Sequence, residues 1–334
     1  MADERDPGGG LWAVADLVTP MALRVAATLR IADHISRGLQ TAPELAAAAS
    51  ADAGTLERLL RHLVTVGVLQ RDESGRYALT ARGEALRDGH ASGLRAQLDL
   101  EGAIGRAELS FVHLLHSVRT GEPAFPLQFG RPFWDDLAQD RARTESYAAQ
   151  MGKDVAAWAR TIVPAYDWGA LGHVVDVGGG NGTLLTALLR HNPELRGTVV
   201  DLPETAETAR RTLAAAGLAQ RSDVVAGSFF DPLPPGAGGY LLTAILHDWD
   251  DAAARAILRR CAEAAGSAGT VLVVEKTGAG GESVRSAMDL RVLVYFGGRE
   301  RGVAELTALA AGAGLSVAAV HPAGDLSIVQ LTSR

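Results

Sequence analysis

Polar side chains that could do chemistry follow the hydrophobic segments of the C-terminal half, where buried strands are expected to end. Asp201, His247 and Glu275 each close or follow such a segment, and so does Ser228. A histidine beside a carboxylate is a plausible general base with its orienter, because the carboxylate fixes the tautomer and stabilises the imidazolium. A base with a pKa near neutrality suits removal of a phenolic proton. His247 could instead begin the helix expected at 249–251, and both interpretations stay open at this point.

A glycine-rich turn lies upstream of these residues. Segment 174–185 runs from a β-branched stretch through four glycines between 178 and 182 into an apolar helical pattern. This order predicts the first strand, turn and helix of a nucleotide-binding sheet, with glycine where the backbone closes on a ligand. The acidic Asp176 suits a cationic cofactor without a pyrophosphate, and Asp201, roughly 20 residues further on, suits ribose hydroxyls. S-adenosylmethionine is such a cofactor.

The elements that must position these groups alternate along the chain from residue 172 onward. The expected strands are 174–177, 198–201, 223–226, 239–245 and 270–275, followed by 316–320 and 327–330. Alternation of strands with helices predicts an α/β, doubly wound, mostly parallel Rossmann-like sheet, with the last two strands as an antiparallel pair at its edge. Ligands of such sheets bind at the carboxyl ends of the strands.

The N-terminal half is predicted to be mainly helical. Residues 11–35 carry apolar side chains on more than one helical face, which indicates a partner, and dimerisation is the expected use. A helix, turn, helix and hairpin pattern over 41–87 predicts a winged helix. A winged helix can bind DNA, form a dimer or wall a substrate site, and acidic residues accompany its arginines.

Composition limits the partners and the compartment that we expect. The chain has 334 residues, a formal net charge of −7 and no basic block, which argues against nucleic acid. Residues 1–10 are polar, acidic and flexible, unlike a signal peptide, and no uninterrupted apolar run is long enough to span a bilayer. We expect a cytoplasmic protein without membrane association or a metal site, and Cys261 as a core residue rather than a nucleophile.

A helical segment rich in aromatic side chains precedes the glycine turn. Between 94 and 166 the helices are expected to break near 121–123 and 130–132. The segment carries Phe125, Phe129, Phe133, Trp134, Tyr147 and Met151. These side chains could be ordinary core or the roof over a flat substrate. We therefore expect three parts: a dimerisation and winged-helix domain (11–95), a helical linker and substrate roof (96–168), and a cofactor-binding domain (169–334).

The chain from about Leu17 onward resembles the winged-helix, S-adenosylmethionine-dependent small-molecule O-methyltransferases. Within that family it is most similar to the actinobacterial enzymes that tailor anthracyclines and related aromatic polyketides. The motifs that carry the resemblance are 17–32, 59–63, 130–134, 176–182, 229–234, 246–251 and 297–301.

The resemblance implies a role for individual positions. His247 matches the family's catalytic base, and Glu275 and Glu300 match the two acidic residues that flank it. The implied cofactor contacts are Gly178 at the methionine end, Asp201 at the ribose, Leu202 and Phe229 beside the adenine, and Asp176, Gly180, Ser228 and Thr243 around them. The expected substrate contacts are Trp134, Tyr147, Met151, Arg291 and Tyr295. Ser228 replaces the aspartate that commonly binds the adenine amine, and Thr243 stands where plant relatives carry a lysine.

These features together predict a homodimeric O-methyltransferase that acts on a phenolic hydroxyl of an aromatic polyketide or related natural product. The alternative is a hydroxylase or decarboxylase on the same scaffold that uses S-adenosylmethionine without consuming it. The complete His247, Glu275 and Glu300 set favours methylation. A third possibility is a regulator that binds DNA through the winged helix. The sequence does not distinguish an oxygen acceptor from nitrogen or carbon, nor does it identify the substrate.

Overall fold

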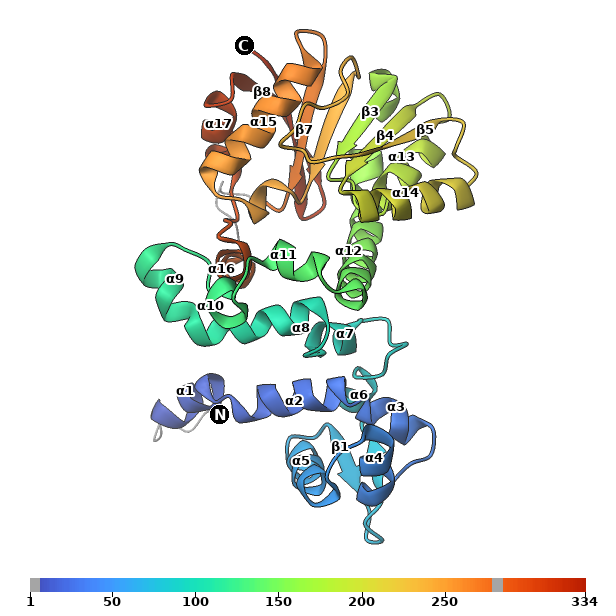
Figure 1. Cartoon of the computed structure of the whole chain (residues 1–334), viewed down its shortest axis with the longest axis vertical. Helices are drawn as coiled ribbons and strands as arrows, with labels where there is room; N and C mark the ends of the chain where they lie inside the picture. The colour runs from blue at the N-terminus through green and yellow to red at the C-terminus, as the bar shows by residue number, and fades with distance from the viewer. Residues whose placement is uncertain (1–6, 278–284) are drawn as a thin grey trace. The chain divides into compact units, whose positions relative to one another are not determined.

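The computed structural model describes residues 7–277 and 285–334, which form two compact units (Figure 1). The first unit comprises residues 1–109 with 140–150, and the second comprises 110–139 with 151–334. Residues 1–6 belong to the acidic N-terminal segment that we expected to be flexible, and they lie outside the described residues.

The first unit has the predicted order of helix, turn, helix and hairpin. Its elements are α1 (Pro7–Ala15), α2 (Val18–Thr28), α3 (Ile31–Ser36), α4 (Ala42–Ala49), α5 (Ala53–Thr65), β1 (Leu69–Arg71), β2 (Tyr77–Leu79), α6 (Ala81–Glu84), α7 (Leu94–Leu98) and α8 (Ala103–Glu108). Thr41 and Glu44 form a capping box that starts α4, and Gly67, with a φ of 71°, follows the end of α5. Leu45, Leu60 and Tyr77 fill the core between these elements.

Helices α1 and α2 present large apolar side chains to solvent. Leu11, Trp12, Val14, Leu17 and Val18 are all exposed, Trp12 to 70%. The stretch Gly10–Thr28 is long and apolar enough to cross a membrane by length and composition alone, and 17% of it is buried. An uncovered apolar face of this size indicates a surface that binds a partner or a membrane.

The second unit begins with short helices that break where glycine and proline predicted. They are η1 (Leu109–His113), shared with the first unit, α9 (Leu114–Thr120), α10 (Phe125–Phe129) and α11 (Phe133–Ala138). The long helix α12 (Arg141–Ile162) continues into this unit and is followed by η2 (Val163–Ala165) and η3 (Trp168–Leu171).

A seven-stranded sheet forms the centre of the second unit (Figure 1). Its strands are β3 (His173–Val177), β4 (Arg196–Asp201), β5 (Ser222–Ala226), β6 (Gly239–Thr243), β7 (Thr270–Glu275), β8 (Leu315–Ala323) and β9 (Leu326–Ser333). They lie in the order β5-β4-β3-β6-β7-β9-β8, and all neighbours are parallel except for the pairs that include β9. The predicted doubly wound sheet with an antiparallel pair at one edge is therefore confirmed.

Helices cover both faces of this sheet because successive strand residues point to opposite sides. The remaining helices are α13 (Thr183–His191), α14 (Pro203–Ala215), α15 (Asp251–Ala265), α16 (Ser286–Phe296) and α17 (Val303–Ala311). Val175 and Tyr240 pack with α15 and α17 on one face, where Cys261 is a fully buried core residue. Val174 and Leu241 pack with α13 and α14 on the other face.

One strand is shorter than predicted. We expected a strand over 239–245, but β6 ends at Thr243 because Ala244 has a φ of 51°. This left-handed conformation is unusual for a residue with a side chain. It turns the chain out of the sheet and into the 3₁₀ turn η4 (Leu246–Asp248).

Candidate active site

The sheet reverses its strand order between β3 and β6. Strands β4 and β5 extend the sheet on one side of β3, and β6 and β7 extend it on the other. The crevice beyond the carboxyl ends of strands at such a reversal is the usual ligand site of a doubly wound sheet. Asp176 lies near the end of β3, and His247 follows β6.

The glycine turn after β3 is held by the end of β4. Gly178 and Gly180 have φ values of 71° and 59°, a region that glycine adopts without strain. The N–H of Gly178 donates to the Val200 carbonyl, and the N–H of Gly180 donates to Asp201 Oδ2, both at 2.8 Å. Asp201 Oδ1 also accepts the N–H of Leu202 at 2.8 Å. Asp201 therefore fixes the turn as well as closing its strand.

Asp176 is a buried carboxylate with spare hydrogen-bonding capacity. It is 2% exposed, and within the described residues its Oδ2 has no hydrogen-bond partner. Burial, reinforced by the charge of Asp201, raises the pKa of Asp176 to about 7. The side chain lies against the turn, since a Cβ on Gly179 would come within 2.7 Å of the Asp176 carboxyl carbon. A cation at this place would stabilise the charged form.

Apolar side chains and two hydroxyls lie around the same strand ends. Leu202 follows Asp201 and is 54% exposed, and a Cβ on Gly178 would lie 3.4 Å from the ring of Phe229. Ser228 Oγ accepts the N–H of Phe230 at 3.1 Å. Thr243 Oγ1, at the end of β6, is buried without a hydrogen-bond partner among the described residues.

His247 lies among three carboxylates. Its Nδ1 donates to Glu300 Oε1 at 2.9 Å and lies 3.9 Å from Glu275 Oε2, while its Nε2 lies 3.4 Å from Asp248 Oδ1. Glu275 Oε1 accepts the backbone N–H groups of Leu246 and His247 at 3.0 and 3.4 Å. The structure thus brings together all three residues that we predicted as catalytic, and it adds Asp248.

The proton affinity of His247 is higher than its residue type alone suggested. Burial lowers the pKa of His247, but the charges of Glu275, Asp248 and Glu300 outweigh this effect and raise it to about 10. We expected a near-neutral pKa from one neighbouring carboxylate. The difference arises because three acidic groups surround the ring.

The segment after α16 holds the turn that carries His247. The N–H of Arg299 donates to the His247 carbonyl at 2.8 Å, and a Cβ on Gly298 would lie 2.2 Å from that oxygen, so this position requires glycine. The Arg301 guanidinium donates to the carbonyls of Leu246 and Trp249. Sequence reasoning assigned no role to Gly298 or Arg301, although both lie in the motif 297–301.

The aromatic residues of the second unit form a cluster on α10, α11 and α16. Phe125, Phe133 and Tyr295 are buried, whereas Trp134 is half-buried and stacks on Phe296 with 5.1 Å between ring centroids. Helix α16 packs against η4, which carries His247. The cluster therefore combines core residues with an accessible aromatic edge. The buried members are core residues, and a roof over a substrate stays a prediction.

The remaining predicted substrate contacts lie on two helices. Arg291 is a half-buried residue of α16, and Met151 is a half-buried residue of α12 in the second unit. Tyr147 belongs to the first unit, so its contact with a substrate stays a prediction.

Family models match most of the chain. An O-methyltransferase domain matches residues 111–316, and an O-methyltransferase dimerisation domain matches residues 12–88. The chain belongs to the O-methyltransferase family. Among curated relatives of this O-methyltransferase, the 2,7-dihydroxy-5-methyl-1-naphthoate 7-O-methyltransferase of Streptomyces carzinostaticus is 57% identical over 97% of each chain. The aclacinomycin 10-hydroxylase of Streptomyces purpurascens is 44% identical over 96% of this chain and 89% of its own.

A solved structure agrees with the assignment of this O-methyltransferase. An O-methyltransferase from neocarzinostatin biosynthesis, crystallised with S-adenosylmethionine and 2-hydroxy-5-methyl naphthoic acid, is 56% identical. It superposes with a TM-score of 0.93 over 97% of this chain and 99% of its own.

The residues of the O-methyltransferase fit the cofactor of such structures. Among the residues that the structure describes, one buried oxygen of the Asp176 carboxylate has no hydrogen-bond partner, and a Cβ on Gly180 would meet nothing within 4 Å. Cationic sulfonium and ammonium groups suit the first feature, and close approach of a ligand suits the second.

Proposed function

We propose that the O-methyltransferase transfers the methyl group of S-adenosylmethionine to a phenolic hydroxyl of a hydroxynaphthoate or related aromatic polyketide, with His247 as general base. The observation that carries this proposal is the juxtaposition of a carboxylate-bound histidine with a glycine turn at the sheet reversal. The 57% identity with a naphthoate O-methyltransferase supports the substrate class.

Residues at the ends of β3, β4 and β6 would hold the cofactor. Asp176 and the turn at Gly178 and Gly180 would receive the methionine portion, and Asp201 would accept bonds from the ribose hydroxyls. Leu202 and Phe229 would enclose the adenine, and Ser228 and Thr243 would offer hydroxyls nearby. When bound, S-adenosylmethionine supplies an electrophilic methyl group on a sulfonium. The protein's own task is to align an acceptor oxygen with it and to deprotonate that oxygen.

His247 would exchange a proton with the acceptor hydroxyl through Nε2, since Glu300 engages Nδ1. Phenols ionise near pH 10, close to the raised pKa of His247 at about 10. Neutral imidazole with phenol and imidazolium with phenolate contain the same number of protons, and matched affinities make their interconversion easy. Glu275 and Glu300 would stabilise the imidazolium that forms. Turnover therefore requires the site to lose one proton relative to its state at neutral pH.

The accessible edge of the aromatic cluster would form the substrate wall. Trp134, at this accessible edge, would contact a flat ring system, the buried Tyr295 would lie behind it, and Met151 would fill the remaining space. Tyr147 stays a predicted substrate contact. Arg291 is the cationic member of this set and would face an acidic substituent. We also propose three consecutive parts of the chain: the N-terminal domain (11–95), a helical linker and substrate roof (96–168), and the cofactor domain (169–334).

An assay that follows two products tests the proposed reaction. The enzyme is incubated with S-adenosylmethionine and a panel of hydroxynaphthoic acids, anthracyclines and simpler phenols, and S-adenosylhomocysteine release is measured with product mass. Release with a one-methylene mass gain supports methyl transfer. A product that gains oxygen or loses carbon dioxide without release of S-adenosylhomocysteine would contradict methyl transfer. It would favour a hydroxylase or decarboxylase on the same scaffold, an alternative that the 44% identity with a hydroxylase supports.

Cofactor affinity should rise with pH because of Asp176. Its pKa of about 7 leaves much of the carboxyl protonated below neutrality, and a cation binds the ionised form. We therefore expect the Kd for S-adenosylmethionine to fall between pH 6 and 8. Asp176→Asn should weaken binding by about 10- to 100-fold at pH 8 and remove this pH dependence. Isothermal titration calorimetry measures both; an unchanged pH dependence in the variant would assign it to another group.

The exposed apolar face of α1 and α2 should mediate homodimerisation, the function named for its matching domain. Trp12→Asp combined with Leu17→Asp should shift the protein toward monomer at micromolar concentration, because charges would be buried in the interface. Light scattering coupled to size exclusion measures the mass, with Arg71→Asp on the exposed hairpin as the control. An unchanged mass would place the interface elsewhere.

We propose a cytoplasmic enzyme that acts without nucleic acid or a membrane.

A further inference from the structure

Arg301 contacts both ends of the turn that carries His247. Its guanidinium is buried, with the residue only 4% exposed. Nη1 donates to the Leu246 carbonyl at 2.7 Å, and Nη2 donates to the Trp249 carbonyl at 2.8 Å. These two carbonyls bracket His247 and Asp248. One planar group therefore spans the turn from its first residue to the residue that follows it.

The turn depends on outside contacts because its own hydrogen bonds are few. The 3₁₀ turn η4 is three residues long and follows the left-handed Ala244. Short 3₁₀ segments have poor hydrogen-bond geometry. Glu275 accepts the N–H groups on the amino side of the turn, while Arg301 satisfies carbonyls on both sides.

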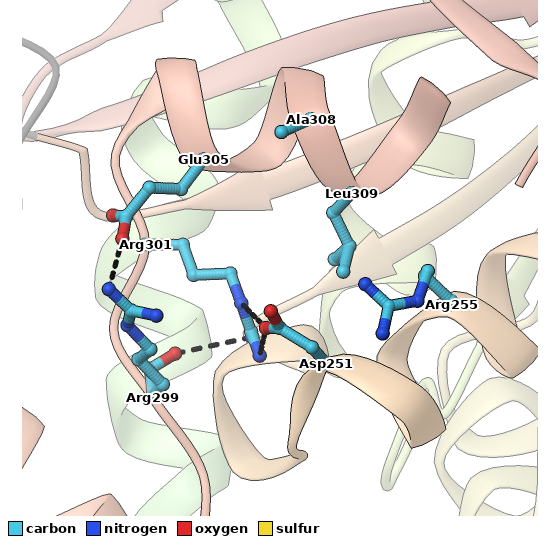
Figure 2. Close-up of a pocket in the computed structure, with 7 residues that line it drawn as sticks. All are labelled: Asp251, Arg255, Arg299, Arg301, Glu305, Ala308 and Leu309. Atoms are coloured by element: carbon cyan, nitrogen blue, oxygen red, sulfur yellow. Dashed lines mark hydrogen bonds and ion pairs between the residues drawn. The ribbon is translucent and has the colours of Figure 1, made fainter. Parts of the chain in front are cut away.

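The guanidinium is itself held in place. Asp251, in the first turn of α15, accepts from Nη2 at 2.8 Å and from Nε at 3.2 Å. Figure 2 shows the Arg301 side chain, from the segment before α17, meeting Asp251. The donors of arginine have a fixed planar geometry that lysine lacks. Asp251 therefore orients the Arg301 guanidinium, and the guanidinium in turn orients the turn 246–249.

We infer that Arg301 is a positioning residue for His247, whose guanidinium keeps the turn 246–249 in the conformation that aims the imidazole at the acceptor hydroxyl. This inference rests on the proposed function, because it concerns the base that we place at His247. A displacement of about 1 Å in such a group can cost about 100-fold in rate.

Arg301→Lys, with Arg259→Lys as the matched control, tests the inference. Arg259 lies on α15, where its exposed guanidinium donates to the Gly312 carbonyl at 3.2 Å. We expect Arg301→Lys to lower kcat by about 10- to 100-fold with little change in the Kd for S-adenosylmethionine. Hydrogen exchange should accelerate in peptides that cover 246–249. Arg259→Lys should change neither. Wild-type kcat and exchange in folded Arg301→Lys would overturn the inference.

Chemical rescue provides a second test. Arg301 lines a cavity of about 170 Å³ with Asp251, Arg255, Arg299, Glu305, Ala308 and Leu309 (Figure 2). In Arg301→Ala, guanidinium added far below denaturing concentration should enter this cavity and restore part of kcat, whereas tetramethylammonium, which cannot donate hydrogen bonds, should not. Equal effects of the two ions would contradict a hydrogen-bonding role.

The double variant separates this inference from the proposed base. If Arg301 acts through His247, Arg301→Lys should cost less than twofold in a His247→Ala background. A full additional loss in that background would overturn the positioning role while leaving the base intact. Undiminished turnover of His247→Ala alone would instead reject the base and with it the proposed function.

Discussion

His247→Ala should lose about 100- to 10,000-fold in kcat while it keeps its affinity for S-adenosylmethionine, because it removes a general base and leaves the glycine turn in place. The residual activity should rise steeply with pH, since the acceptor hydroxyl then ionises in solvent. In the wild type, activity should also rise above neutrality, because burial lowers the pKa of His247 but Glu275, Asp248 and Glu300 raise it to about 10. Steady-state rates between pH 6 and 10 measure both profiles.

The control for this prediction keeps the hydrogen bond but not the proton transfer. In the wild type, Glu300 accepts a hydrogen bond from His247 Nδ1. In His247→Asn the amide NH₂ can still donate to Glu300, but the amide does not titrate. We expect it to be as slow as the alanine variant. His191→Ala, an exposed histidine at the end of α13, should leave the rate unchanged. Wild-type turnover in His247→Asn would remove proton transfer from the role of this residue.

The sheet and the cofactor turn could be predicted from sequence because their signals are local. A β-branched run, glycines and an apolar helix are contiguous between His173 and His191, and the helix breaks in the first half follow glycine and proline. The end of β6 could not be predicted in this way. Residues 239–245 are mostly apolar, and only the left-handed Ala244 shows where the strand stops.

The group around His247 was predicted in part: Glu275 and Glu300 were expected near it, but neither Asp248 nor the size of the pKa shift was. Glu275 is the last residue of the neighbouring strand β7, so its approach to His247 could be expected from the sheet alone, whereas Glu300 was assigned by resemblance only. The raised pKa of His247 depends on the adjacent Asp248 and on Glu275 and Glu300 from two other segments, whose distances to the ring no sequence pattern gives. Arg301 was missed for the same reason, because an arginine beside a glutamate at positions 300 and 301 is typical of a solvated surface, yet both are buried.

Asp201→Ala should weaken binding of S-adenosylhomocysteine by about 30- to 1000-fold. The carboxylate accepts the N–H groups of Gly180 and Leu202, and its loss leaves two backbone donors without their partner, at about 1–3 kcal/mol each. The turn would then relax before a ligand binds, so part of the binding free energy would be used to order it. Calorimetry with S-adenosylhomocysteine measures the affinity without the chemical step.

The matched control for Asp201 is Glu204→Ala, which removes an exposed carboxylate in the first turn of α14, three residues away. Glu204→Ala should bind S-adenosylhomocysteine with wild-type affinity, because no N–H of the glycine turn contacts the Glu204 carboxylate in the described residues. The affinity of Asp201→Asn should lie between those of Asp201→Ala and Glu204→Ala. Its amide oxygen can accept from Gly180 or from Leu202, but its NH₂ group then faces the other donor. Equal affinity of Asp201→Asn and wild type would show that the charge and the second acceptor are dispensable. The turn would then be ordered by its glycine geometry, by the Gly178 bond to Val200 and by the one hydrogen bond that the amide oxygen still accepts.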